Sequence, residues 1–429
     1  MIKKLFLLTS ISCLVFFVSL SQAHQSAYHD FGIDKPVFNL RQLGGITQGQ
    51  IKNRLWSDDY WAKYAGGLAY RYAEPGFWLD INNPKPNDWK VPGLHILRHH
   101  PASRLIKEGR VNHLSPAEKY DLLVGDTGRQ GDPGYSLTRA FIYDINQRTE
   151  PWEGSCDGWA YAAYNEAPPV KSVAVRNLAG QLITFYPSDI RALLTLLYSE
   201  YRVSSFGRKC KTPNPAADAQ GRLIDAQCRD TNPGDFHTVL VNQVGIDKRG
   251  FSVDTDYAKE VWNQPVKSFK LQYFNPQTMA VYANGYHAKV AKSRYSSDRF
   301  AAHRDPQGTH IVGVDVDVQY QIEAFPKPVS HLTPAHDKTA SATYRYDLEL
   351  DASGNIIGGE WAISSQRNHP DLITYVATHD LVRSQFDSKI SGNTLTEVLQ
   401  SLQPHFAKQT SARKRPLFKV VKALARLSQ

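Results

Sequence analysis

The residues with the clearest chemical potential surround one cysteine, Cys156, in the stretch WEGSCDGWAYAAYN (residues 152–165). Ser155 is a suitable N-cap, Asp157 is acidic in the first turn and alanines follow, so the pattern predicts a helix that begins at Cys156. A thiol at a helix N-terminus faces unpaired N–H groups and the positive end of the helix dipole, which lower its pKa and favour the nucleophilic thiolate. Gly154 permits the sharp turn, and the backbone N–H of Cys156 could hold an oxyanion. The alternative is a small buried cysteine in an ordinary helix.

A candidate general base lies in residues 236–257. The runs FHTVLVNQV and FSVDTD are rich in β-branched residues and are separated by IDKRG, which predicts an antiparallel hairpin. With the turn at 245–248, His237 would face Asp254 across the two strands, with ~5 Å between Cβ atoms. An imidazole held by a carboxylate is a general base. Asp256 is the alternative partner, and a surface position is the alternative for His237.

Three further side chains are candidates for the wall of this site or for support of an oxyanion: Trp159, Trp262 and Gln264. Trp262 would cover the His–Asp pair, and Gln264, which follows Asn263, offers an amide. The alternative for this stretch is a packed tryptophan followed by a polar turn.

The N-terminus has the features of a secretory signal peptide. Lysines precede an apolar run over residues 5–20, and Ser-Gln-Ala at 21–23 offers small residues for cleavage. We therefore predict a signal peptide over residues 1–23 and a secreted or periplasmic protein. The alternative is an uncleaved membrane anchor.

Cysteine usage agrees with an oxidising compartment. Removal of residues 1–23 leaves three cysteines, an odd number. Cys210 and Cys228 bracket a loop rich in Pro, Asn, Asp and Ala and are predicted to form a disulfide, which leaves Cys156 as the free thiol.

The basic charge is concentrated at the C-terminal end. The formal net charge is +9, and residues 405–429 hold seven cations and no acid. Leu417, Val420 and Leu424 fall on one helical face with cations opposite, which predicts a basic amphipathic helix. Such a helix could bind an anionic membrane surface, or simply dock on the body. The rest of the mature chain is neutral and has no nucleic-acid-binding motif, so we expect no nucleic-acid partner.

The predicted fold class is α+β, a papain-like or transglutaminase-like core with a helix-start cysteine and with His and Asp on strands, packed on an antiparallel β domain. Helices are expected at 114–126, where Ser115, Pro116 and Glu118 form a start signal, and from Ser188 onwards. Strands are expected at 311–325 and 342–364. The expected divisions are a pro-segment or arm at 24–61, a catalytic α+β domain at 62–290, an antiparallel β domain at 300–385 and the basic tail at 405–429.

No metal or cofactor is predicted. Residues 351–355 resemble the start of a calcium loop, but Ile356 stands where an EF-hand needs glycine, and we expect a simple turn between strands.

Several long motifs together resemble the transglutaminase elicitor family, whose best-known members are secreted oomycete enzymes. The resemblance covers roughly residues 59–372, through the motifs WEGSCDGWA, LSPAEKYDLLVGD, YPSDIRALLTLLY, NPGDFHTVLVNQVGI, FSVDTD, EVWNQPV, LELDASGNIIGGEW and HPDL. The resemblance implies a protein-glutamine γ-glutamyltransferase with a Cys-His-Asp triad, carried over to Cys156, His237 and Asp254. One departure is Asp157, where the family tends to read histidine.

The activity so implied is acyl transfer through a thioester. Cys156 would attack a protein glutamine, ammonia would leave, and a lysine or small primary amine would take the acyl group, without calcium. The expected partners are therefore proteins with accessible glutamine and lysine. A cysteine peptidase or an amidase or deamidase on the same site is the enzymatic alternative, and a non-catalytic binding module is the other.

Overall fold

The computed structural model describes residues 27–75, 101–126, 137–138, 140–141, 149–199, 203–229, 231–257, 259–381, 387–402 and 417–429. The predicted signal peptide lies outside these residues. No helix among them is long and apolar enough to cross a membrane.

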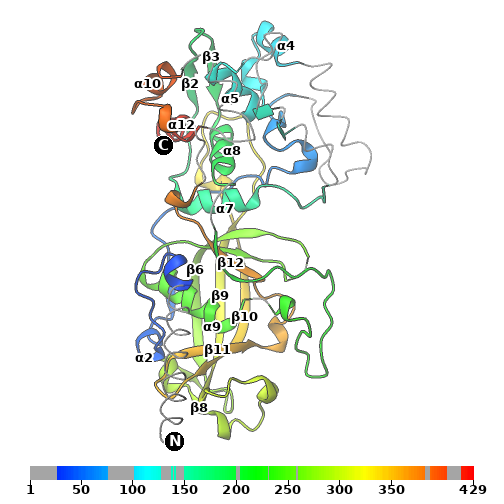
Figure 1. Ribbon diagram of the computed structural model, residues 1–429, viewed down its shortest axis with the longest axis vertical. Helices are drawn as coiled ribbons and strands as arrows, with labels where there is room; N and C mark the ends of the chain where they lie inside the picture. The colour runs from blue at the N-terminus through cyan, green and yellow to red at the C-terminus, as the bar shows by residue number, and fades with distance from the viewer. Residues whose placement is uncertain are drawn as a thin grey trace, which may run out of the picture.

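The molecule has a helical half and a sheet half, and helix α7 lies across their junction (Figure 1). The described helices are α2 Leu40–Leu43, α4 Ala102–Lys107, α5 Pro116–Val124, α7 Cys156–Asn165, α8 Pro187–Leu197, α9 Pro233–Val239, the π-helix Leu240–Ile246, α10 Leu395–Gln400 and α12 Phe418–Leu427. A small hairpin of β2 (Val173–Arg176) and β3 (Leu182–Phe185) belongs to the helical half.

The sheet half is built on one antiparallel sheet, whose order in the described chain is β11-β10-β9-β6-β5-β12-β4. Its strands are β4 Ser204–Gly207, β5 Ser252–Asp254, β6 Asn263–Phe274, β9 His310–Ile322, β10 Lys338–Leu350, β11 Ile356–Trp361 and β12 Leu372–Tyr375. Short strands extend it: β1 Gln48–Gln50 and β7 Val281–Tyr282 pair with β6, and β8 Val290–Ala291 pairs with β9.

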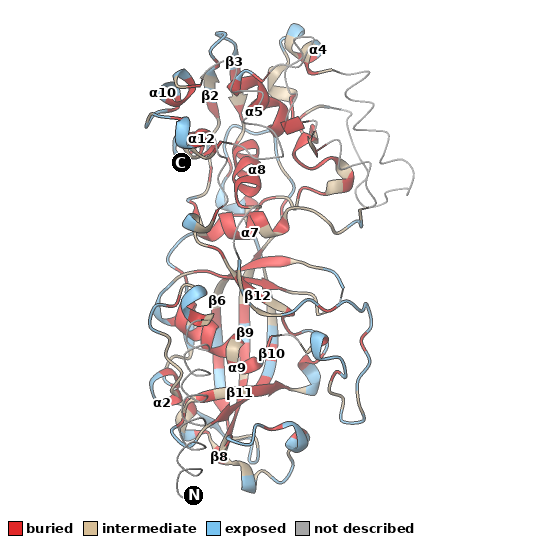
Figure 2. Cartoon of the chain, in the orientation of Figure 1, coloured by how far each residue is buried: buried red, intermediate tan, exposed pale blue. Residues whose placement is uncertain are grey.

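Alternation of apolar and polar residues explains the long strands. In β9, Val312, Val314, Val316 and Val318 are buried, whereas Asp317 is exposed. Successive side chains of a strand point to opposite faces, so this alternation gives the sheet one core face and one wetter face. Figure 2 shows the same mixture of buried and exposed positions along the sheet. The strands expected at 311–325 and 342–364 are present as β9, β10 and β11.

Pairing across the sheet joins segments that are distant in sequence. Strand β6 lies within the predicted catalytic domain, and β9 lies within the predicted β domain. The two strands pair from Val266↔Tyr320 to Phe274↔Gly313. The two predicted ranges therefore share one sheet. Residues 27–61 also join the body, because they supply β1 and the fully buried Trp56.

Of the two serines predicted to begin helices, Ser115 is an N-cap and Ser188 is not. In α5, Ser115 Oγ accepts the N–H of Glu118 and the Glu118 carboxylate accepts the N–H of Ser115, so the predicted capping box is confirmed. Helix α8 begins at Pro187, with the Asp189 carboxylate accepting the Tyr186 N–H, so Ser188 is inside the helix. Ile190, Leu193 and Leu194 of α8 are fully buried.

The predicted hairpin at 236–257 is wrong in its first strand. Residues 233–246 form α9 and the π-helix, and only Ser252–Asp254 is a strand. The reason is a helix-start signal: Asn232 accepts the N–H of Gly234 as N-cap, and Pro233 occupies the first helical position. This signal and the tertiary packing of α9 outweigh the β-branched composition, which is a weak preference.

The C-terminal helix α12 is amphipathic, as expected, and its apolar face is covered. Val420, Val421 and Leu424 are fully buried, and α12 packs against α8 and α10. Lys422 Nζ is paired with Glu166, which also accepts the hydroxyl of Tyr198 at 2.5 Å. The predicted disulfide between Cys210 and Cys228 is also confirmed.

Candidate active site

Cys156 is the first residue of α7, as predicted, and it is the free cysteine of the described chain. Its sulfur lies 3.6 Å from the carbonyl oxygen of Val261, to which the thiol donates, and 3.8 Å from the Asn263 amide nitrogen. Ser155 is the N-cap residue, but its side chain makes no capping hydrogen bond. The thiol therefore faces the start of β6.

Burial dominates the electrostatics of this thiol. Cys156 is only 6% exposed, and burial, with the Asp157 carboxylate as the second cause, raises the pKa of Cys156 to about 12. The backbone and side-chain N–H groups of Asn263 act in the opposite direction. The sequence-based expectation of a lowered pKa is thus wrong for this closed arrangement, because desolvation disfavours the thiolate more than nearby donors favour it.

Tyr60 and Val261-Trp262 form a cover over the start of α7, and we call these three residues the thiol cover. The Tyr60 carbonyl accepts the N–H of Ser155 at 2.6 Å, and the ring of Tyr60 lies 5.5 Å from that of Trp262. A Cβ at Gly154 would lie 2.2 Å from the Tyr60 carbonyl oxygen, so glycine is needed for this close approach. Of these residues, Val261 contacts the Cys156 sulfur through its carbonyl oxygen, and Cys156 is buried.

His237 lies away from the thiol. It is on α9, not on a strand, and its two ring nitrogens lie 2.9 Å from the hydroxyl of Tyr346 and 3.1 Å from that of Tyr273. Tyr273 is ten positions along β6 from Asn263. Ten residues of extended strand cover roughly 30 Å, far beyond the ~3 Å needed for proton transfer to the imidazole. Burial lowers the pKa of His237 to about 3, so the ring is neutral.

Asp254, in contrast, lies on the strand pair that meets the thiol. It ends β5 and is paired with Asn263 of β6, not with His237. One carboxylate oxygen accepts the N–H of Trp262 at 2.8 Å and that of Asp256 at 3.2 Å. The other oxygen is buried and has no hydrogen-bond partner among the described residues. Burial raises the pKa of Asp254 to about 8.

The three predicted wall residues have separate environments. Trp159 is fully buried in the core, and its indole donates to the Trp56 carbonyl. Trp262 is half-buried in the thiol cover, where its indole donates to Glu260. Gln264 is buried and its amide donates to both oxygens of the Glu323 carboxylate. Tyr60 and the Val261 carbonyl gave no sequence signal, because a backbone contact depends on long-range folding.

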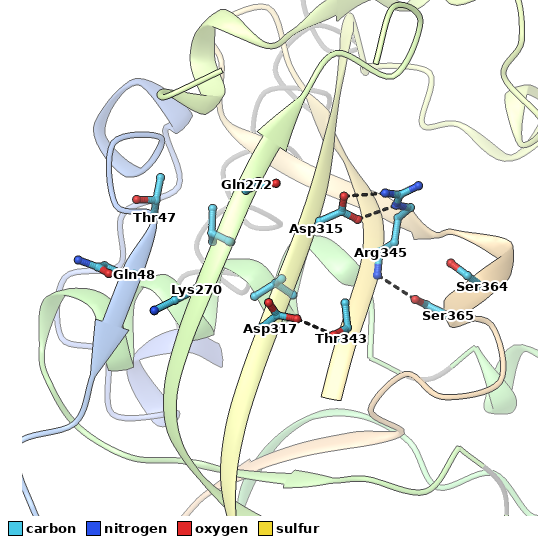
Figure 3. Close-up of a pocket in the computed structure, with 12 residues that line it drawn as sticks. Thr47, Gln48, Lys270, Gln272, Asp315, Asp317, Thr343, Arg345, Ser364 and Ser365 are labelled. Atoms are coloured by element: carbon cyan, nitrogen blue, oxygen red, sulfur yellow. Dashed lines mark hydrogen bonds and ion pairs between the residues drawn. The ribbon is translucent and has the colours of Figure 1, made fainter. Parts of the chain in front are cut away.

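Other features of the described chain do not add to this site. No group of three His, Cys, Asp or Glu residues among the described positions could hold a metal ion. A groove of about 730 Å³ crosses the outer face of the sheet, and two of its charged side chains, Arg345 and Asp315, form an ion pair (Figure 3). None of the residues that line the groove belongs to the Cys156 site.

Comparison with known proteins defines the class. The crystal structure of the GP42 transglutaminase from Phytophthora sojae matches with a TM-score of 0.54 at 18% sequence identity, over 93% of this chain and 95% of that chain. This likeness shows the fold, a mixture of helices and antiparallel sheet. No curated protein sequence matches significantly.

The family follows from a second comparison. The model of the transglutaminase elicitor family matches residues 147–401, more than half of the chain, and the chain belongs to that family. Family and fold together support a transglutaminase-like function of the acyltransferase type.

Proposed function

We propose that this protein is a secreted transglutaminase that forms γ-glutamyl isopeptide bonds between protein glutamine and primary amines, with Cys156 as the nucleophile. The observation that carries the proposal is the position of Cys156: the free thiol of the described chain begins a helix inside the matched family range. The thiol lies beside the Asn263 amide, and Asp254 is the direct strand partner of Asn263.

The proposed reaction has two steps. In the first, Sγ bonds to the glutamine amide carbon, the C–N bond breaks and ammonia leaves with the thiol proton. In the second, an amine nitrogen bonds to the same carbon, the C–S bond breaks and the amine proton returns to sulfur. The acyl group is thereby transferred from nitrogen to nitrogen without an added oxidant or reductant.

Asp254 is the proposed proton carrier. In its ionised form, Asp254 takes the thiol proton and passes it to the departing nitrogen, then repeats this in reverse for the incoming amine. It is preferred to His237 because it ends the strand paired with Asn263, whereas the His237 ring is held by two tyrosine hydroxyls elsewhere in the sheet half. A buried carboxyl with a strongly shifted pKa is typical of an active site.

The test is incorporation of a fluorescent primary amine into casein by the purified protein and by its Cys156→Ala variant, with no calcium added. We expect labelling by the wild type only. Release of ammonia without labelling would instead assign an amidase or deamidase, because water would then replace the amine. Labelling by a folded Cys156→Ala variant would exclude Cys156 as the nucleophile.

A further inference from the structure

Unpaired acceptor oxygens gather at the start of β6. The Asn263 side-chain oxygen and one Asp254 carboxylate oxygen are buried, and neither has a hydrogen-bond partner among the described residues. Buried polar atoms are satisfied in the great majority of native structures, and leaving one unpaired costs ~1–3 kcal/mol. These two atoms belong to one directly opposed residue pair, of which Asn263 lies beside the candidate nucleophile, and they indicate that something else supplies the donors.

The pairing of β5 with β6 orients both side chains. Asp254 and Asn263 are direct partners in an antiparallel ladder, so their side chains lie on the same face. In the next pair the Thr255 N–H donates to the Trp262 carbonyl, and this alternation makes Asp254–Asn263 the more closely spaced, non-hydrogen-bonded kind of pair. The Asn263 amide nitrogen lies 3.8 Å from the Cys156 sulfur, so this face is the one that meets α7.

The side chain of Asn263 therefore presents a complete carboxamide edge beside the thiol. Its N–H₂ group donates and lies near the sulfur, whereas its oxygen accepts and is unpaired. A second carboxamide complements this edge, because its N–H can donate to the Asn263 oxygen while its carbonyl oxygen accepts from the Asn263 nitrogen. Such a pair would bring the carbonyl carbon of the bound amide close to Sγ.

Resting on the proposed function, we infer that Asn263 binds the γ-carboxamide of the donor glutamine as an amide–amide pair and thereby selects an amide over a carboxylate or an ester. The second N–H of the substrate amide points to the unpaired oxygen of Asp254. A glutamate side chain would place an acceptor oxygen against the Asn263 oxygen, which leaves both without a donor. Binding requires the thiol cover to open, since Cys156 is enclosed in this structure.

The experiment compares two acyl donors that form the same acyl-enzyme: a blocked glutamine dipeptide, and its γ-methyl ester, in which –OCH₃ replaces –NH₂. Fluorescent amine incorporation gives kcat/KM for each donor. Asn263→Leu removes both hydrogen-bonding atoms, whereas Asn263→Asp keeps acceptor oxygens and removes the donor. Gln272→Leu is the matched control, since Gln272 is an exposed amide on the same strand, nine residues further along β6.

The ester has no N–H, so it cannot use the Asn263 oxygen. We expect Asn263→Leu to lower kcat/KM for the ester about tenfold and for the amide about a hundredfold, because each lost hydrogen bond costs about a factor of ten. The amide-to-ester ratio therefore falls about tenfold in Asn263→Leu. In Asn263→Asp both rates fall, and the amide-to-ester ratio stays near the wild-type value. In Gln272→Leu neither rate falls, and the ratio is again unchanged.

The outcomes separate this inference from the proposed function. If Asn263→Leu lowers both rates equally, amide selection by Asn263 is overturned while transglutaminase chemistry stands. If the wild type incorporates amine from neither donor and releases no ammonia, the proposed function is wrong, and this inference, which rests on it, is wrong too. Thermal unfolding of each variant shows whether a lost rate reflects a lost fold.

Discussion

Asp254 is a buried acid whose proton is held more tightly in the folded protein than in the unfolded chain. Burial raises the pKa of Asp254 to about 8 from an ordinary value near 4. Its contribution to stability is therefore complete at low pH and is lost as the pH rises from 4 towards 8, by at most about 1.4 kcal/mol per pH unit.

This gives a prediction for Asp254→Asn, which keeps the shape and cannot ionise. Between pH 5 and pH 8, we expect the wild type to lose free energy of unfolding relative to Asp254→Asn, measured by urea denaturation at each pH. A difference between the two proteins that does not change with pH would mean that Asp254 is ionised throughout. The same variant should lose amine incorporation if Asp254 carries the proton.

His237 is predicted to be structural. It joins the hydroxyls of Tyr273 and Tyr346 in the sheet half, and its substitution by Phe would leave both hydroxyls buried without this partner. We expect His237→Phe to lower the free energy of unfolding by roughly 1–3 kcal/mol. Amine incorporation per folded molecule should stay within about twofold of wild type.

A triad role for His237 makes the opposite prediction. A well-folded His237→Phe protein with incorporation reduced by orders of magnitude would place the imidazole in the chemistry and would require a structure in which α9 approaches α7.

At the scale of elements, the thiol cover decides whether Cys156 can react. Burial raises the pKa of Cys156 to about 12, so at neutral pH the sulfur carries its proton and is a poor nucleophile. Opening the cover would expose the sulfur to water and remove the effect of burial on its pKa. The N–H groups at the start of α7 would then lower the pKa and favour the thiolate.

We therefore predict that Tyr60→Ala and Trp262→Ala each increase the rate of Cys156 alkylation by iodoacetamide at pH 7.5, by about tenfold for each unit by which the thiol pKa falls. Mass spectrometry of the labelled protein follows the rate. Tyr286→Ala, at a partly exposed site in the sheet half, is the control and should leave the rate unchanged. Equal rates in all four proteins would show that the cover does not limit access.

At the scale of the whole molecule, the helical half is held together by its C-terminal helix. Fully burying each of Val420, Val421 and Leu424 contributes about 1.5–3 kcal/mol. Lys422 also pairs with Glu166, the residue that directly follows α7. Residues 417–429 thus support the elements that position Cys156.

Removal of residues 417–429 should lower the free energy of unfolding by about 5 kcal/mol, the summed effect of these side chains. It should also abolish amine incorporation at 37 °C. Urea denaturation of the full chain and of the truncated chain measures the difference. Unchanged stability and activity would instead favour a peripheral role for the helix, such as the proposed binding of anionic membranes, which sedimentation with anionic vesicles tests.

The sequence by itself determined the features that depend on neighbouring residues. Ser115, Pro116 and Glu118 identify the start of α5 because capping acts within one turn. The alternation of apolar and polar residues in β9 and β10 identifies two strands, because successive side chains of a strand point to opposite faces of the sheet. The disulfide partners followed from the number and spacing of the cysteines, and the long motifs indicated the family that the comparison confirms.

Only the tertiary structure decided what surrounds Cys156. The pairing of Asp254 with Asn263 depends on strand register across a gap in sequence, and the pKa of Cys156 depends on its burial in the folded protein. A local sequence pattern predicts neither the register nor the pKa. Register is set by long-range packing, and desolvation is caused by atoms from distant segments. His237 shows the same limit: its type suggested a base, but its place on α9 puts it among tyrosines far from the thiol.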